Sequence, residues 1–115
     1  MADNGSHYPV SEPAYFILLS LAGGPRHGYA VLKDTQELSD GRVSVSVSTL
    51  YTVLGRLQEQ GMIARLDTVD DEPAPGLPRK VYRLTHQGQR VLDAEALRLQ
   101  TLLSAYRQRL GTDRA

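Results

Sequence analysis

The chain has 115 residues, a formal net charge of zero and no cysteine. This length suits one domain with a modest core, and the lack of cysteine excludes disulfides and thiolate metal sites. The longest apolar stretch, residues 14–22, includes Ser20 and is too short to cross a bilayer. We therefore expect a single-domain cytoplasmic protein.

The chain is expected to begin with a flexible lead-in over residues 1–10, which contain little to bury. Ser11 is a candidate N-cap, and the Glu-Pro pair after it suits a first helical turn. The apolar run of residues 15–21 leaves almost no polar face, so this helix is either buried in the core or shared between subunits. A Gly-Gly-Pro sequence ends it.

A second helix is predicted from about His27 to Leu38, and the Asp-Gly pair at residues 40–41 ends it. Residues 43–45 alternate Val-Ser-Val with period two, which predicts one small strand. Either Ser46 or Ser48 can then cap a third helix.

The third helix is predicted to bury a single apolar stripe and to end near Gly61, a natural residue after a helix. The stripe has the spacing i, i+3, i+4, i+7 and consists of Leu50, Val53, Leu54 and Leu57. The other faces carry hydrogen-bonding side chains, namely Ser48, Thr49, Tyr51, Thr52 and Arg56.

Two strands over residues 63–69 and 79–84 are predicted to form a hairpin, because an Asp-, Pro- and Gly-rich loop joins them. Thr85 can cap a last helix over residues 86–110, with a tail at 111–115. That helix carries an apolar seam with steps of four and three residues, namely Leu92, Ala96, Leu99, Leu103, Tyr106 and Leu110.

Three helices, a hairpin and a long helix, in that order, predict a mainly α (α+β) winged helix-turn-helix domain over residues 11–85. The helix over residues 86–110 is then expected to dimerise. In such domains the third helix lies in the major groove and the hairpin, or wing, reaches the backbone. The polar faces of the third helix suit base edges, and the return strand carries cations suited to phosphates. These cations are Arg79, Lys80 and Arg83.

Three spaced motifs carry a family resemblance: His-Gly-Tyr at residues 27–29, Ser-Thr-Leu-Tyr at 48–51 and Arg-Lys-Val-Tyr-Arg-Leu-Thr at 79–85. Together they resemble the PadR family of transcriptional regulators. The resemblance implies a dimeric winged-helix repressor that a small molecule releases from DNA. It also implies DNA contacts by the third helix and the wing, at Thr49, Tyr51, Arg56, Arg79 and Lys80.

The chain departs from the family pattern in two places. Thr52 stands where the family often has proline, and the wing tip is acidic because of Asp70, Asp71 and Glu72. The acids weigh against deep insertion of the tip into a groove.

The seam of the last helix can pack on its own domain or on a partner, but the small domain and the apolar first helix favour a homodimer. Two reading helices would then face a pseudo-palindrome with half-sites about 10 base pairs, or a multiple, apart. The expected interface residues are Tyr15, Phe16, Leu19, Leu92, Ala96, Leu99, Leu103, Tyr106 and Leu110. A small aromatic effector could bind between subunits, in a pocket lined by Tyr15, Phe16, Leu99 and Tyr106.

Plainer interpretations stay open for these residues. Ser48 and Thr49 can act as capping hydroxyls only, Tyr51 can be a partly buried aromatic, and the wing cations can form a solvated strand edge. A winged-helix protein-interaction module without DNA binding is therefore the alternative function. An enzyme is not expected, since His7, His27 and His86 are scattered and no metal, cofactor or nucleophile motif is present.

Overall fold

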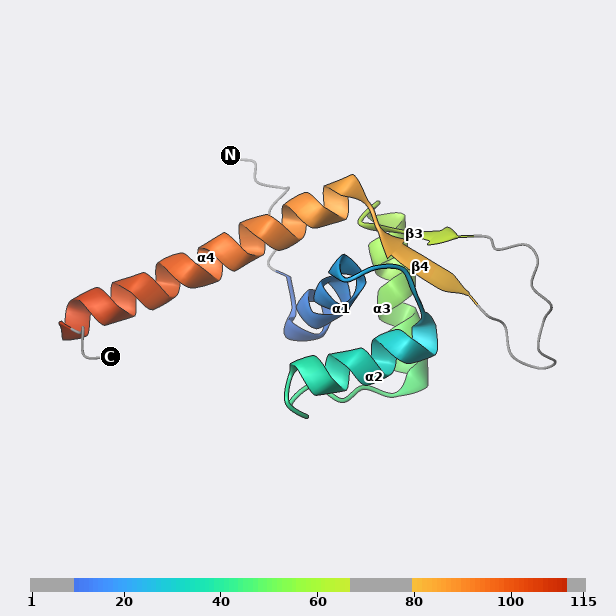
Figure 1. Cartoon of the computed structure of the whole chain (residues 1–115), viewed down its shortest axis with the longest axis horizontal. Helices are drawn as coiled ribbons and strands as arrows, with labels where there is room; N and C mark the ends of the chain where they lie inside the picture. Colours follow the sequence, from blue (N-terminus) through green and yellow to red (C-terminus); the bar gives the residue numbers. More distant parts are fainter. Residues whose placement is uncertain (1–9, 67–79, 112–115) are drawn as a thin grey trace.

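The computed structural model describes residues 10–66 and 80–111, which form four helices and three short strands. In chain order these are α1 (Glu12–Ala22), β2 (Arg26–His27), α2 (Gly28–Leu38), α3 (Val47–Glu59), β3 (Ile63–Leu66), β4 (Val81–Leu84) and α4 (His86–Leu110). α1, α2 and α3 pack together beside the sheet, and α4 passes over α1 and projects beyond it (Figure 1). This confirms the predicted mainly helical winged helix-turn-helix with a long C-terminal helix.

Three of the four helices begin at a hydroxyl side chain. Ser11, Ser46 and Thr85 each accept a hydrogen bond from the backbone N–H three residues later, over 3.2, 3.1 and 2.9 Å respectively. Each bond satisfies one of the amides that a helix start leaves unpaired. Ser46, rather than Ser48, is therefore the cap of α3, and the predicted starts of α1 and α4 are confirmed.

The core lies where α1, α2, α3, the sheet and the start of α4 meet. Leu50, Leu54 and Leu57 are at most 4% exposed, whereas Val53 is half-buried, so α3 is held by the predicted stripe. Burying each leucine stabilises the fold by about 2 kcal/mol. The other elements contribute Ile17, Leu18, Leu21, Val31, Ile63, Tyr82 and Leu92.

The sheet is antiparallel with the strand order β2-β4-β3. Arg65 of β3 and Arg26 of β2 both lie opposite Tyr82 of β4. The strand β2, which has only two residues, was not predicted from the sequence. β4 begins at Val81, later than predicted, since Lys80 lies outside the strand, and β3 is described from Ile63 as far as Leu66. Residues 67–79, with the acidic wing tip and Arg79, lie outside the described residues, as do 1–9 and 112–115.

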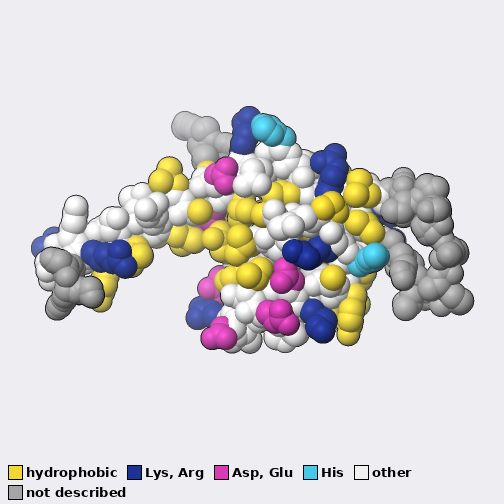
Figure 2. Space-filling model, viewed as in Figure 1, with side chains coloured by type: hydrophobic (Ala, Val, Ile, Leu, Met, Phe, Trp, Pro, Cys, Tyr) yellow, Lys and Arg dark blue, Asp and Glu magenta, His cyan; other side chains and the backbone are white. Residues whose placement is uncertain are grey.

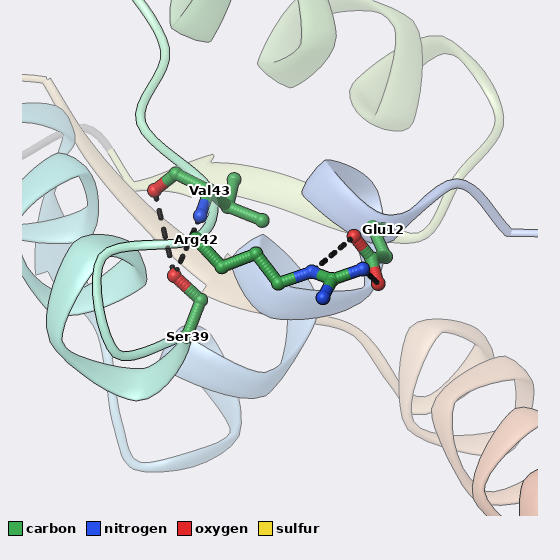
Figure 3. A network of polar contacts seen from close by, with 4 residues as sticks. All are labelled: Glu12, Ser39, Arg42 and Val43. Atoms are coloured by element: carbon green, nitrogen blue, oxygen red, sulfur yellow. Dashed lines mark hydrogen bonds and ion pairs between the residues drawn. The ribbon is translucent and has the colours of Figure 1, made fainter.

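The strand predicted at residues 43–45 is wrong. This stretch pairs with no strand among the described residues; instead the Ser39 hydroxyl accepts the Val43 N–H over 2.9 Å, and the Val43 side chain is buried (Figure 3). Beside it, the Arg42 Nε donates a hydrogen bond to Glu12 Oε1 over 3.2 Å, and its Nη2 forms an ion pair with Glu12 Oε2 at 3.1 Å. The two valines of this stretch therefore attach the connection between α2 and α3 to the core, and they do not belong to a sheet.

Two further expectations need correction. Leu92, expected at a dimer interface, is 5% exposed and belongs to the protomer's own core, because the first turns of α4 pack on the domain. Val10, placed in the lead-in, packs against the same core.

Two buried hydroxyls mark a local weakness of the core. Within residues 10–66 and 80–111, the hydroxyls of Ser20 and Thr35 are fully buried and have no hydrogen-bond partner. Burying a hydroxyl without a partner is unfavourable.

We predict that Thr35→Val raises the free energy of unfolding by about 1 kcal/mol, because valine keeps the shape and removes the unpaired hydroxyl. Urea denaturation monitored by circular dichroism measures the change. Thr101→Val, on an exposed turn of α4, is the matched control and should change stability little. A loss of stability in Thr35→Val would contradict this account of the core.

Candidate nucleic-acid interface

The polar side of α3 faces solvent. Ser48, Thr49, Thr52 and Arg56 are all exposed, whereas the leucine stripe of the same helix is buried. Gly55 lies on this surface too, and a Cβ atom built there would meet nothing within 4 Å. We call the surface formed by these five residues the outer face of α3. It is open to a large partner along the length of the helix.

Hydroxyl groups near the start of α3 form hydrogen bonds within the helix start. The Ser46 Oγ donates to Thr49 Oγ1 over 3.1 Å, and Thr52 Oγ1 donates to the Ser48 carbonyl over 3.0 Å. The Arg56 guanidinium, by contrast, makes no hydrogen bond or ion pair with another described residue. The outer face thus offers short, locally ordered hydroxyls near its start and one free guanidinium further along.

Tyr51 lies at the edge of the outer face and is 37% exposed. Its ring packs against Gly28 at the start of α2, where an added Cβ atom would lie 2.9 Å from Tyr51 Cζ and closer still to the hydroxyl oxygen. Burial raises the pKa of the nearby Tyr82 phenol; Tyr51 raises that pKa further, and Arg65 opposes both effects. Tyr51 therefore packs on α2 and acts electrostatically on Tyr82 of β4, neither of which could be predicted from its position in the sequence.

The described wing cations are Lys80, immediately before β4, and Arg83 within it. Lys80 is half-buried, and its carbonyl accepts the Gly28 N–H over 3.3 Å, which holds it beside the start of α2. Arg83 is exposed and pairs with Ala64 in the ladder, on the sheet face opposite the buried Tyr82. The structure thus places Lys80 near Tyr51, through Gly28, and Arg83 on the outer side of the sheet.

Charges of both signs are mixed over the face seen in Figure 2, but three ion pairs among the described residues involve other cations. Arg26 pairs with Asp34 at 3.6 Å, and two further pairs join Arg42 to Glu12 and Arg98 to Glu95. Among the described residues, Arg56, Lys80 and Arg83 have no acidic partner. A chain of zero net charge therefore still presents uncompensated cations at α3 and β4.

A second candidate surface is the apolar face of the projecting part of α4 (Figure 2). Ala96 is exposed, and Leu99, Leu103, Tyr106 and Leu110 are 41 to 61% exposed. Leu102, at 54% exposed, extends the same face and was missed by the sequence analysis, although it lies three residues after Leu99 and four before Tyr106. We call these six residues the α4 seam. Five of these six residues were expected at the interface; the three expected on α1, Tyr15, Phe16 and Leu19, are half-buried.

The two α1 aromatics of the expected effector pocket touch each other. The rings of Tyr15 and Phe16 meet edge to face, with centroids 5.4 Å apart and planes at 80°. Leu99 and Tyr106, the other expected lining residues, are exposed on α4. One protomer therefore leaves all four side chains at least partly open to solvent.

Comparison with known proteins decides the family. Residues 17–94, more than half of the chain, match the model of the transcriptional regulator PadR-like family. This chain belongs to the PadR-like family. A search of curated proteins returned no match.

Solved structures agree with this assignment. A PadR family transcriptional regulator from Eggerthella lenta is 29% identical, with a TM-score of 0.62 over 89% of this chain and 87% of that one. Bacillus subtilis PadR in complex with operator DNA is also 29% identical, with a TM-score of 0.59 over 70% of this chain and 44% of that one. A PadR family regulator from Clostridium difficile is 22% identical and shares the fold, with a TM-score of 0.69 over 87% of this chain and 99% of that one.

The described part of this PadR-like regulator contains no helix long and apolar enough to cross a membrane. Within the same residues, no three His, Cys, Asp or Glu side chains gather as a metal site would require.

The point where α4 leaves the domain carries a buried acid. Glu95 is 8% exposed, and Arg98 donates to both of its carboxylate oxygens, over 3.0 and 2.7 Å. The hydrogen bond from Arg98 lowers the pKa of Glu95, although burial acts in the opposite direction. After this pair, every residue of α4 is exposed.

We predict that Glu95→Gln destabilises this PadR-like regulator at pH 7 and that the difference from wild type disappears in acid. A carboxyl whose folded pKa lies below its ordinary value of 4.5 stabilises the fold above that value, and the contribution is lost as pH falls through the folded pKa. Urea denaturation from pH 7 to about pH 3 tests this. Exposed Glu59→Gln is the control, and a deficit that did not change with pH would contradict the ion-pair explanation.

Proposed function

We propose that this PadR-like regulator is a sequence-specific DNA-binding repressor that acts as a homodimer on a pseudo-palindromic operator. The observation that carries the proposal is the outer face of α3, which is polar, exposed and held opposite a buried leucine stripe. A reading helix needs this arrangement, with one face fixed in the core and the other free to approach base edges. The 29% identity to Bacillus subtilis PadR, solved with operator DNA, supports it.

The two kinds of side chain in this interface are proposed to act differently. Ser48, Thr49, Thr52 and Arg56 on α3 approach base edges, where hydroxyls and guanidinium groups distinguish base pairs. On the wing, Lys80 and Arg83, with Arg79, neutralise phosphates and so contribute affinity without sequence preference. The lack of acidic partners for Arg56, Lys80 and Arg83 among described residues supports this division.

The α4 seam is proposed to form the dimer interface together with Tyr15, Phe16 and Leu19. Its exposed leucines and tyrosine repeat at heptad spacing along a helix that extends beyond its own domain. Water-exposed apolar side chains in such a row are stabilised when a second copy covers them. A twofold axis through this interface would present two α3 helices to successive major-groove segments.

We also propose that a small aromatic effector binds between the subunits and loosens DNA binding. The edge-to-face pair of Tyr15 and Phe16 offers an aromatic wall, and Leu99 and Tyr106 are exposed on the α4 seam, which the same dimer would cover. Aromatic rings favour stacked or edge-to-face contacts with other rings. This part of the proposal depends on the dimer.

We predict that Lys80→Ala and Arg83→Ala weaken binding to all duplexes and each lower the slope of log K against log salt by about 1, because each removes one phosphate contact. Arg56→Ala should instead relax the sequence preference, at a loss of about 1–3 kcal/mol for the preferred duplex. Selection of bound duplexes from a random pool, followed by fluorescence polarisation at several salt concentrations, measures both effects.

Arg90→Ala removes the same charge from an exposed position on α4 outside this interface, and it is the control for net charge. If wild type bound no random-sequence duplex even at low salt, the chain would instead be a winged-helix protein-interaction module. If the Lys80, Arg83 and Arg56 variants all bound as wild type does, the proposed DNA face would be wrong.

We predict that wild type sediments as a dimer and that combining Leu99→Glu with Leu103→Glu makes it monomeric, because two charges would have to be buried in the α4 seam. Leu97→Glu is the matched control: Leu97 is 62% exposed but lies about 200° around the helix from Leu99. Sedimentation equilibrium gives the mass, and circular dichroism checks that the helix persists. A monomeric wild type, or an unchanged dimer in the double variant, would exclude this interface.

A further inference from the structure

The starts of α2 and β4 and the second turn of α3 meet at Gly28. This residue is the first of α2 and is buried. Its N–H donates to the Lys80 carbonyl over 3.3 Å, and the two residues before it form β2, which pairs with β4. The wing is therefore attached to the beginning of α2 through backbone hydrogen bonds.

The Tyr51 side chain occupies the space that a larger residue at Gly28 would need. An added Cβ atom there would lie 2.9 Å from Tyr51 Cζ, too close without a shift, and 3.1 Å from Cε1, which is a tight contact. The Tyr51 hydroxyl is directed at this backbone position. About two thirds of the residue is covered, so only part of its surface is available to DNA.

We infer that Tyr51 is a positioning residue: its ring, seated on Gly28, sets the arrangement of the reading helix α3 relative to the wing strand β4. Gly28 lies between the two elements. Because it has no side chain, the end of Tyr51 can pack against its backbone, and its N–H donates to the Lys80 carbonyl. Tyr51 also lies close enough to Tyr82 in the middle of β4 to influence it electrostatically. The inference rests on the proposed function only where DNA is concerned.

This role differs from a direct contact of the Tyr51 hydroxyl with DNA. Two of the three Tyr51 atoms nearest to a Cβ atom built on Gly28, Cζ and Cε1, belong to the ring, so we expect a positioning role to survive loss of the hydroxyl oxygen alone. A DNA contact depends instead on the hydroxyl as donor or acceptor. Tyr51→Phe keeps the ring and removes the hydroxyl, and Tyr51→Ala removes both. The pair therefore separates the two roles.

The first test is a double-mutant cycle without DNA. Gly28→Ala should lower the melting temperature by roughly 5 °C, and the same substitution in a Tyr51→Ala background should lower it little further, because the clash is gone. Gly55→Ala, where a Cβ atom meets nothing, is the control for a glycine change in a helix. Additive losses would show that Gly28 and Tyr51 do not interact, and would overturn the inference.

The second test measures the arrangement itself. Because the chain has no cysteine, spin labels attach only to cysteines that are introduced. We place these at two exposed positions, Gln58→Cys on α3 and Arg83→Cys on β4. Labelled chain is mixed with excess unlabelled chain, so that distances within one protomer dominate. We expect Tyr51→Phe to keep the wild-type distance distribution and Tyr51→Ala to shift or broaden it. An unchanged distribution in Tyr51→Ala would contradict the inference.

The third test uses the duplex that wild type selects from a random pool. Tyr51→Ala should bind it about tenfold more weakly, and Tyr51→Phe should restore most of the affinity. Equal losses in the two variants would assign the hydroxyl to a DNA contact and overturn the positioning role. If wild type bound no duplex, the proposed function would fail, while the cycle and the spin-label distances would still decide the role of Tyr51.

Discussion

The burial of one leucine stripe on α3 is the constraint on which the interface depends. Leu50, Leu54 and Leu57 together remove three large apolar side chains from water, at about 2 kcal/mol each. Rotating the helix by half a turn would expose them and bury hydroxyls and a guanidinium without partners, which is far less favourable. The polar outer face is thus directed to solvent by the core, whatever partner it meets there.

Local signals in the sequence predicted where the helices lie. Ser11 and Thr85 cap their helices through their own hydroxyls, and Gly61 takes the positive φ of 78° that follows α3, so the information sits within a few residues of each boundary. The strand β2 and the Val43 connection could not be predicted in this way. Their hydrogen bonds depend on β4 and on Ser39, and a two-residue pattern does not indicate which partner is available.

The candidate site was predictable to a similar degree. Amphipathic spacing alone was enough to predict the exposed hydroxyls and Arg56 on α3. The seating of Tyr51 on Gly28 was not predictable, because it joins two distant motifs that each look complete alone. Leu92 shares its spacing with Leu99, yet one is buried and the other exposed. The difference arises because α4 leaves the domain near Glu95. A heptad pattern does not indicate where along a helix the contact with its own domain ends.

The reading helix is held at both of its ends by the elements that are proposed to contact DNA and a partner. Near its start, Tyr51 packs on Gly28, which is bonded to the wing. Beyond its end, Thr85 donates to the Gly61 carbonyl over 2.7 Å, so that the cap of α4 is tied to the residue that closes α3.

The first turn of α4 is packed as tightly against the same place. A Cβ atom at Gly88 would collide with the Met62 carbonyl oxygen and lie 2.8 Å from Leu84 Cδ1. The start of α4 and the end of α3 are therefore packed and hydrogen-bonded at the same two residues, Gly61 and Met62. The helix proposed to pair two subunits and the helix proposed to read DNA meet at this point.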